Sequence, residues 1–220
     1  MTIGVLDFDV RPSTSPSVER VWRARSTLGG PFTSIAAANV ELVVERSEQR
    51  TTLTLRGPES AASTAVCPPE TTWLGIRLRV GTYFGSMPSG SIRDGRDMTF
   101  DVQDDTVALR HGTTLPLPRF DDAEAFVQGL VAAGFLRRDA LVESVVSNGR
   151  VLDQGASHRT VQRRFAWVTG LTRRAFVQIE RARFATHLLQ RGADIAGSHG
   201  RGTRSVTTSW GSSPAPTRSS

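Results

Sequence analysis

Ser157-His158-Arg159-Thr160-Val161-Gln162-Arg163-Arg164-Phe165 combines a helix start with a dense group of arginines. Ser157 suits the N-cap position, because its hydroxyl can accept a hydrogen bond from a free backbone N–H group of the first turn. Val161 and Phe165 lie four residues apart, so they can share the buried side of a helix. The arginines fall mainly on the opposite side. The sequence therefore predicts an amphipathic helix over residues 157–168.

A second helix is predicted directly after Thr169-Gly170, because glycine is the usual residue just past a helix C-terminus. Thr172 can cap this helix, which is expected to extend to Arg191 before Gly192. Its apolar residues recur at helical spacing: Ala175, Ile179, Ala182, Ala185, Leu188 and Leu189. The chain is thus expected to place two helices in succession across a short turn.

The exposed side of the first helix carries residue types that recognise DNA bases. Arginine pairs bidentately with guanine and glutamine with adenine, so such a helix suits the major groove. Arginines at the start of the second helix would lie where backbone N–H groups already favour a phosphate. We expect base contacts from Arg159, Gln162 and Arg163, and phosphate contacts from Arg164, Arg173 and Arg174. The full set of candidate DNA-binding residues is Ser157, His158, Arg159, Gln162, Arg163, Arg164, Arg173 and Arg174.

This order of residues resembles the DNA-binding region of the AraC/XylS family of transcription regulators. The matching segments are Ser157-x-Arg159-Thr160-Val161-Gln162-Arg163-Arg164-Phe165, Thr169-Gly170-Leu171, Gln178-Ile179-x-Arg181-Ala182-Arg183 and Leu188-Leu189. The resemblance implies two helix-turn-helix units joined by a long helix, here Thr172 to Arg191. It also implies regulation of transcription by sequence-specific binding in the major groove of double-stranded DNA.

The N-terminal part alternates like β-strands. The predicted strands are Ile3–Val10, Val18–Arg25, Ser34–Glu45, Thr51–Arg56 and Thr71–Val80, with a break at Arg11–Pro16 and a loop with marginal strand over Met87–Asp105. Short strands at this spacing favour a sandwich or a jelly-roll barrel. The expected fold class is therefore α+β, with a β-rich domain ahead of an all-α helix-turn-helix domain.

A second, weaker resemblance concerns this β-rich part. Pro16-Ser17-Val18 with Trp22, Gly57-Pro58, and Gly75-Ile76-Arg77-Leu78-x-Val80-Gly81 followed by Gly85-x-Met87-Pro88 look like the N-terminal domain of one subgroup of these regulators. Such domains are similar to cupins, and in relatives they bind effectors or mediate dimerisation. A small-molecule effector, a second copy of the chain and RNA polymerase are therefore the further candidate partners.

Helical patterns begin at Asp121 and continue to the basic region. Acidic residues in a first turn favour the helix dipole, and Phe126 to Val131 supply a buried side before Gly134. A further helix is predicted from Arg138 to Ser147, packed behind the recognition helix. The connection Asn148–Ala156 is longer than the turn of an ordinary helix-turn-helix.

Charge divides the chain in the same way. Residues 147–220 carry a net charge of +9 and residues 1–146 a net charge of −3, which together give the overall +6. An acidic part followed by a basic part suits a sensor joined to a nucleic-acid binder. We expect a sensor or dimerisation domain over 1–120, an incomplete helical DNA-binding domain over 121–196 and a disordered tail over 197–220.

The tail is expected to be disordered because Val206 and Trp210 are its only sizeable apolar residues. The family resemblance stops after Ala196, where a second helix-turn-helix would continue. The tail is interpreted as a frame-shifted reading of that unit. If residues 200–204 are encoded GGG-CGG-GGT-ACG-CGG, reading from the last base of each codon gives Ala-Gly-Tyr-Ala, which resembles the Ala-Gly-Tyr of family members.

Two other functions compete with DNA binding. A regulator fragment could sense or dimerise without specific DNA binding. A cupin-like metalloenzyme would need several histidines with a carboxylate, whereas the N-terminal part has only His111. We therefore expect no enzyme activity, no cofactor and no metal.

The sequence predicts a cytoplasmic protein without membrane contact. Cys67 is its single cysteine, and it has neither a long apolar run nor a signal pattern.

Overall fold

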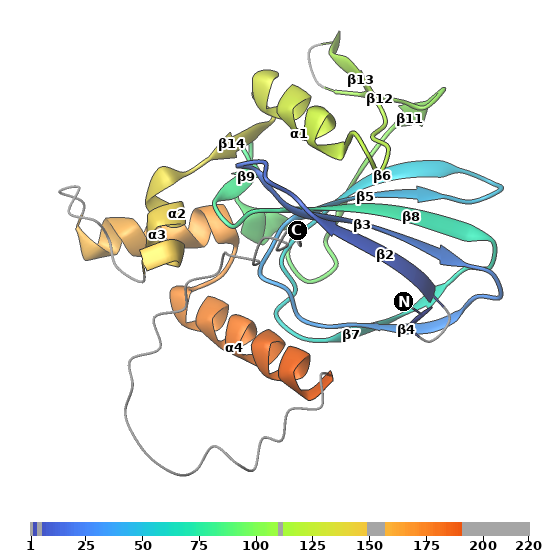
Figure 1. The fold of residues 1–220 in the computed structure, drawn as a ribbon. Helices are drawn as coiled ribbons and strands as arrows, with labels where there is room; N and C mark the ends of the chain where they lie inside the picture. The colour runs from blue at the N-terminus through green and yellow to red at the C-terminus, as the bar shows by residue number, and fades with distance from the viewer. Residues whose placement is uncertain (1, 4–5, 110–111, 149–156, 191–220) are drawn as a thin grey trace, which may run out of the picture.

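The computed structural model describes residues 2–3, 6–109, 112–148 and 157–190. The fold is α+β, with strands through the N-terminal part and helices in the C-terminal part (Figure 1). The expected fold class is confirmed at this level.

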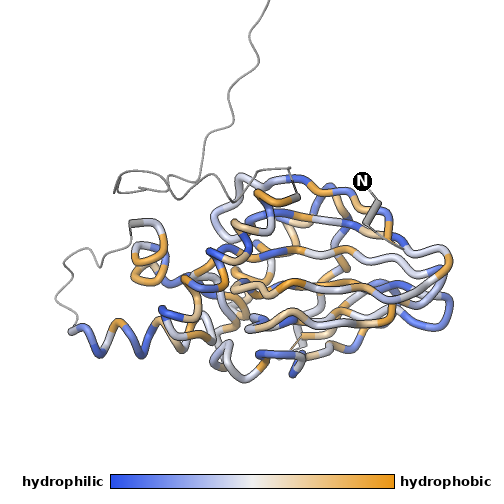
Figure 2. Tube along the Cα trace, turned by 90° about the horizontal axis from the view of Figure 1, so that it is seen from below, coloured by the Kyte–Doolittle hydropathy of each residue, from blue (hydrophilic) through white to orange (hydrophobic). Residues whose placement is uncertain are grey.

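The central feature is a seven-stranded antiparallel sheet in the order β1-β2-β3-β8-β5-β6-β10. Its strands are β1 (Thr2–Ile3), β2 (Leu6–Pro12), β3 (Val18–Ser26), β5 (Glu41–Arg46), β6 (Thr51–Arg56), β8 (Thr71–Leu78) and β10 (Met98–Phe100). Apolar side chains meet across neighbouring strands, as in the row of Val21, Ile76 and Leu42. All three are nearly inaccessible to solvent, so this row belongs to the core. In Figure 2 hydrophobic residues recur along the strands, interrupted by hydrophilic ones.

Three small antiparallel sheets surround the central one. They are formed by β4 (Gly30–Ser34) with β7 (Ser63–Cys67), by β9 (Thr82–Phe84) with β14 (Leu136–Arg138), and by β11 (Val102–Gln103), β12 (Thr106–Ala108) and β13 (Thr114–Pro116). A short 3₁₀ helix, η1 (Ser89–Ile92), follows β9.

The two faces of the central sheet are covered differently. One face packs against α1 (Ala123–Ala132), whose Phe126, Val127 and Leu130 join the main hydrophobic core. On the other face the Trp22 indole crosses the backbone of Gly75, where a Cβ would lie 1.9 Å from the ring. Glycine is therefore required at this position, because any side chain would displace the indole.

The remaining helices form a second hydrophobic cluster. They are α2 (Ala140–Asn148), α3 (His158–Thr169) and α4 (Arg173–Gln190). Val142, Phe165 and Ile179 are buried in this cluster together with Ala38 from the β-rich part, and Val80 and Tyr83 pack against it. The helices are thus attached to one end of the β-rich part (Figure 1).

The predicted strands and helices are largely present, with four corrections. β2 continues through Pro12, past the break predicted at Arg11. The single strand predicted over Ser34–Glu45 is two, since β4 ends at Ser34 and β5 begins at Glu41. The predicted helix start at Arg138 is instead the end of β14, and α2 begins at Ala140. The helix expected from Asp121 begins at Ala123.

Candidate nucleic-acid interface

Both ends of α3 have the caps that the sequence predicts. The Ser157 hydroxyl accepts a hydrogen bond from the Thr160 backbone N–H at 3.2 Å, and Ser157 itself is extended. Gly170 ends the helix in the left-handed conformation, with φ of 70°, and its N–H donates to the Ala166 carbonyl at 2.9 Å. Glycine reaches this conformation without the steric penalty of a side chain. The Ser157 hydroxyl is therefore engaged in capping.

The apolar side of α3 is fully covered. Val161, Phe165 and Val168 are buried, and the Phe165 ring meets the Phe176 ring of α4 edge to face at 5.6 Å between centroids. Such aromatic pairs add stability beyond the area that they bury. This packing fixes which side of α3 faces outward.

The outward side of α3 carries the three predicted base-contacting residues. Arg159, Gln162 and Arg163 are all exposed, and Gln162 and Arg163 lie three and four residues after Arg159, so the structure brings them together on one face. His158 is also exposed at the start of the helix. Trp167, one turn beyond Arg163, is 48% exposed. The helix thus presents a polar, cationic surface with an aromatic residue at its far end.

Arg164 has an intramolecular partner that the sequence did not reveal. Its Nε donates to the carboxylate of Asp139, whose side chain is only 2% exposed. The same carboxylate accepts from the Val142 backbone N–H at 3.0 Å and so caps α2. The hydrogen bond to Asp139 raises the pKa of Arg164. Arg164 therefore fastens α3 to α2, and its predicted phosphate contact stays a prediction.

The start of α4 forms a second cationic surface. The Thr172 hydroxyl accepts from the Ala175 backbone N–H at 3.2 Å, as predicted for a cap. Arg173 and Arg174 are exposed, and they line an open hollow of about 510 Å³ with Val177, Gln178 and Arg181. Arg181 is not among the residues predicted from the sequence to bind DNA. Its position two helical turns after Arg174 could have identified it, because residues seven apart share a helix face.

The β-rich part directly supports this pair of helices. The Ser89 hydroxyl donates to the Val168 carbonyl at 2.6 Å, and Arg93 reaches the Gly170 carbonyl at 3.5 Å. At the other end of the contact, Arg183 of α4 donates to the Asn39 amide oxygen at 3.3 Å. The Asn39 amide nitrogen in turn donates to the Leu78 carbonyl at 2.9 Å. These hydrogen bonds hold α3 and α4 in a defined position against the β-rich part.

Several predicted features lie outside the described residues. These are His111, most of the connection Asn148–Ala156, and the tail 197–220. Within the described ranges, no three His, Cys, Asp or Glu side chains are grouped as metal ligands would be. In the same part of the chain, no helix has the length and apolar character needed to cross a membrane.

Comparisons with protein-family models, with curated proteins and with solved structures find no significant match.

Proposed function

We propose that this protein is a DNA-binding transcription regulator of the AraC type, in which α3 binds in the major groove. One observation carries the proposal. Arg159, Gln162 and Arg163 share an exposed face of a helix whose opposite side is buried and whose two ends are capped. A recognition helix needs this arrangement, because its base-reading side chains must extend from a rigid support.

In this proposal the two cationic surfaces have different roles. Side chains of α3 contact base edges, which provide sequence discrimination. Arg173 and Arg174 neutralise phosphates at the start of α4, where the free backbone N–H groups add to the attraction. The β-rich part would be the cupin-like sensor or dimerisation domain, with an effector, a second copy of the chain and RNA polymerase as partners.

The test is fluorescence anisotropy with the DNA upstream of the coding region and with random DNA of equal length. In protein whose second unit is restored by the shifted reading frame, Arg163→Ala should cost about 1–3 kcal/mol on the specific fragment and relax specificity at one base. Arg173→Ala should weaken binding to all sequences and lower the salt slope by about one. Arg50→Ala, in the exposed turn between β5 and β6, is the matched control for loss of charge. Equal losses for both variants on specific and random DNA would contradict these roles.

The affinity of the intact chain decides between this function and its main rival. With one predicted recognition helix among the described residues, binding is expected to be weak and close to non-specific, at about 10⁻⁴–10⁻⁶ M at physiological salt. Nanomolar binding to its own promoter would contradict the interpretation of the tail as a frame-shifted second unit. If the intact chain shows no DNA binding at all, the result would favour a regulator fragment that senses or dimerises without binding DNA.

The metalloenzyme alternative has a separate test. We propose that residues 1–120 hold no metal ion, because the N-terminal part offers a single histidine. Protein purified without added metal should show no stoichiometric Fe, Zn or Mn by mass spectrometry. Stoichiometric metal that is lost in His111→Ala would overturn this expectation.

A further inference from the structure

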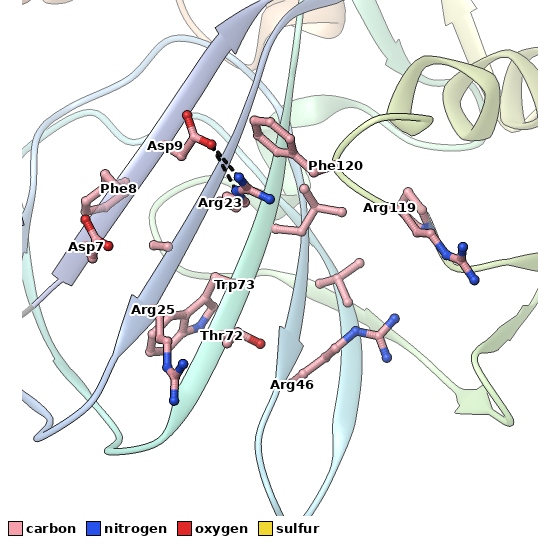
Figure 3. Close-up of a pocket in the computed structure, with 14 residues that line it drawn as sticks. Asp7, Phe8, Asp9, Arg23, Arg25, Arg46, Thr72, Trp73, Arg119 and Phe120 are labelled. Atoms are coloured by element: carbon pink, nitrogen blue, oxygen red, sulfur yellow. Dashed lines mark hydrogen bonds and ion pairs between the residues drawn. The ribbon is translucent and has the colours of Figure 1, made fainter. Parts of the chain in front are cut away.

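A hollow of about 670 Å³ lies on the central sheet (Figure 3), and its lining residues come from elements other than α3 and α4. Strands β2, β3, β8 and β5 form its floor, and the segment Pro118–Phe120 before α1 forms its wall. The volume lies in the range of sites for small organic ligands.

The strand register arranges the floor in two rows. In one row, Asp7 of β2 lies opposite Arg25 of β3, and Arg25 and Arg46 of β5 flank Thr72 of β8 on the same face. Neighbouring strands are about 4.8 Å apart, so the two arginine Cα atoms are separated by roughly 10 Å. A single carboxylate placed over Thr72 is within reach of both long side chains. Figure 3 shows Arg25 and Arg46 on either side of Thr72.

The adjacent row is charged at one end and apolar at the other. It runs from Asp9 of β2, whose carboxylate pairs with Arg23 at 2.7 Å, through Arg23 to Leu74 and Val44, on the same face as Thr72. Val44 is 2% exposed, and the Phe120 ring stands at this end of the hollow with the Arg23 guanidinium 4.4 Å from its centroid. The end over Thr72 is thus net cationic, since Arg25 and Arg46 outnumber Asp7, and Leu74 and Val44 form an apolar patch on the side of Phe120.

The wall is held in place before any ligand arrives. Arg11 of β2 donates from Nε and Nη2 to the Phe120 carbonyl at 3.0 and 2.6 Å, and its guanidinium also binds the Glu124 carboxylate of α1 at 2.6 and 2.7 Å. Phe120 is thus fixed between the sheet and α1. A site that is already formed does not lose affinity to ordering of its own segments.

The arginines can exchange their present partners for a ligand. Arg25 pairs with Glu70 at 3.2 Å, but the two side chains are 64% and 49% exposed. Arg46 pairs with Asp105, which is 68% exposed. Exposed ion pairs of this kind contribute little, so a carboxylate bound by both guanidinium groups in a partly desolvated hollow can replace them.

We propose that this hollow binds an organic carboxylate with an apolar body. The carboxylate lies over Thr72 between Arg25 and Arg46, and the apolar body lies on Leu74 and Val44 against Phe120. This site goes beyond the proposed DNA contact and does not depend on it, because it uses different residues of the β-rich part.

Isothermal titration of the full chain with 2-naphthoate tests the site. We expect a Kd below about 1 mM, which is modest for a ligand of this size. Arg25→Gln and Arg46→Gln should each weaken binding by about tenfold, because each removes a charged hydrogen-bond donor. Thr72→Trp should abolish binding by filling the space between the two arginines. Arg50→Gln, outside the hollow, should bind like the wild type.

Two probes separate the parts of the proposal. The uncharged 2-naphthalenemethanol and inorganic phosphate should each bind at least tenfold more weakly than 2-naphthoate. If the alcohol binds as tightly as 2-naphthoate, the site does not recognise a carboxylate. If phosphate binds as tightly as 2-naphthoate, the proposed contact with the apolar body of the ligand is wrong. Absence of binding at about 1 mM, or binding that both Gln variants retain, would overturn the site itself. Circular dichroism of each variant verifies that the fold is kept.

Discussion

Helices α3 and α4 are neighbours in sequence but differ in how completely they are packed. On α3 every large apolar side chain of the inward face is buried, from Val161 to Val168. On α4 the buried apolar side chains are Phe176 and Ile179 in the first half, whereas Phe184 is 45% and Leu189 is 54% exposed. Packing against the rest of the molecule therefore holds α3 along its length and α4 mainly at its start.

The largest expected effect tests this difference directly. Phe165→Ala should lower the free energy of unfolding by about 3–5 kcal/mol, because the ring is 2% exposed and its removal leaves a cavity beside Phe176. Phe184→Ala should cost clearly less, about 1 kcal/mol, because Phe184 is 45% exposed and so buries only part of its ring. Urea unfolding of both variants measures the contrast. Similar losses would show that the second half of α4 is packed in solution.

A smaller effect concerns the polar fastening of α3. Asp139→Ala removes both the cap of α2 and the partner of Arg164, so it should cost about 1–2 kcal/mol. Asp139→Asn keeps an oxygen that can accept from Val142, so it should cost less. Thermal unfolding of the two variants separates the stability contributed by the α2 cap from that contributed by the ion pair with Arg164. An equal loss in the two variants would mean that the ion pair, and not the cap, dominates.

The contrast between α3 and α4 also shows what could be predicted from the sequence. The caps Ser157 and Gly170 and the apolar face of α3 depend on residues within a turn of each other, and they were located to within one residue. The contact of Asp139 with Arg164 joins residues 25 apart, so it depends on how α2 and α3 pack. Sequence alone gave no sign of it.

The same limit applies to the sheet. Strands β9 and β14 have three residues each and pair across about fifty residues of intervening chain, so neither shows a detectable periodicity. The hollow needs Arg25, Thr72 and Arg46 in register on three strands, and that register is fixed only when the sheet forms. Long-range pairing, and not local propensity, determines this candidate site.

The smallest predicted effect extends the comparison to α1, which is fastened to the sheet by charge. Hydrogen bonds from Arg11 hold the pKa of Glu124 at about 2, well below its ordinary value of 4.5. A carboxyl group whose pKa is lowered by folding stabilises the fold above about pH 4.5, and this contribution disappears as the pH falls toward 2. Because both side chains are about one quarter exposed, we expect only about 1 kcal/mol from the pair.

Thermal midpoints at pH 5 and pH 2.5 should therefore differ less in Glu124→Gln than in the wild type. Glu48→Gln, in an exposed turn, is the control and should behave like the wild type. An unchanged pH dependence in Glu124→Gln would mean that apolar packing, and not this ion pair, holds α1 against the sheet.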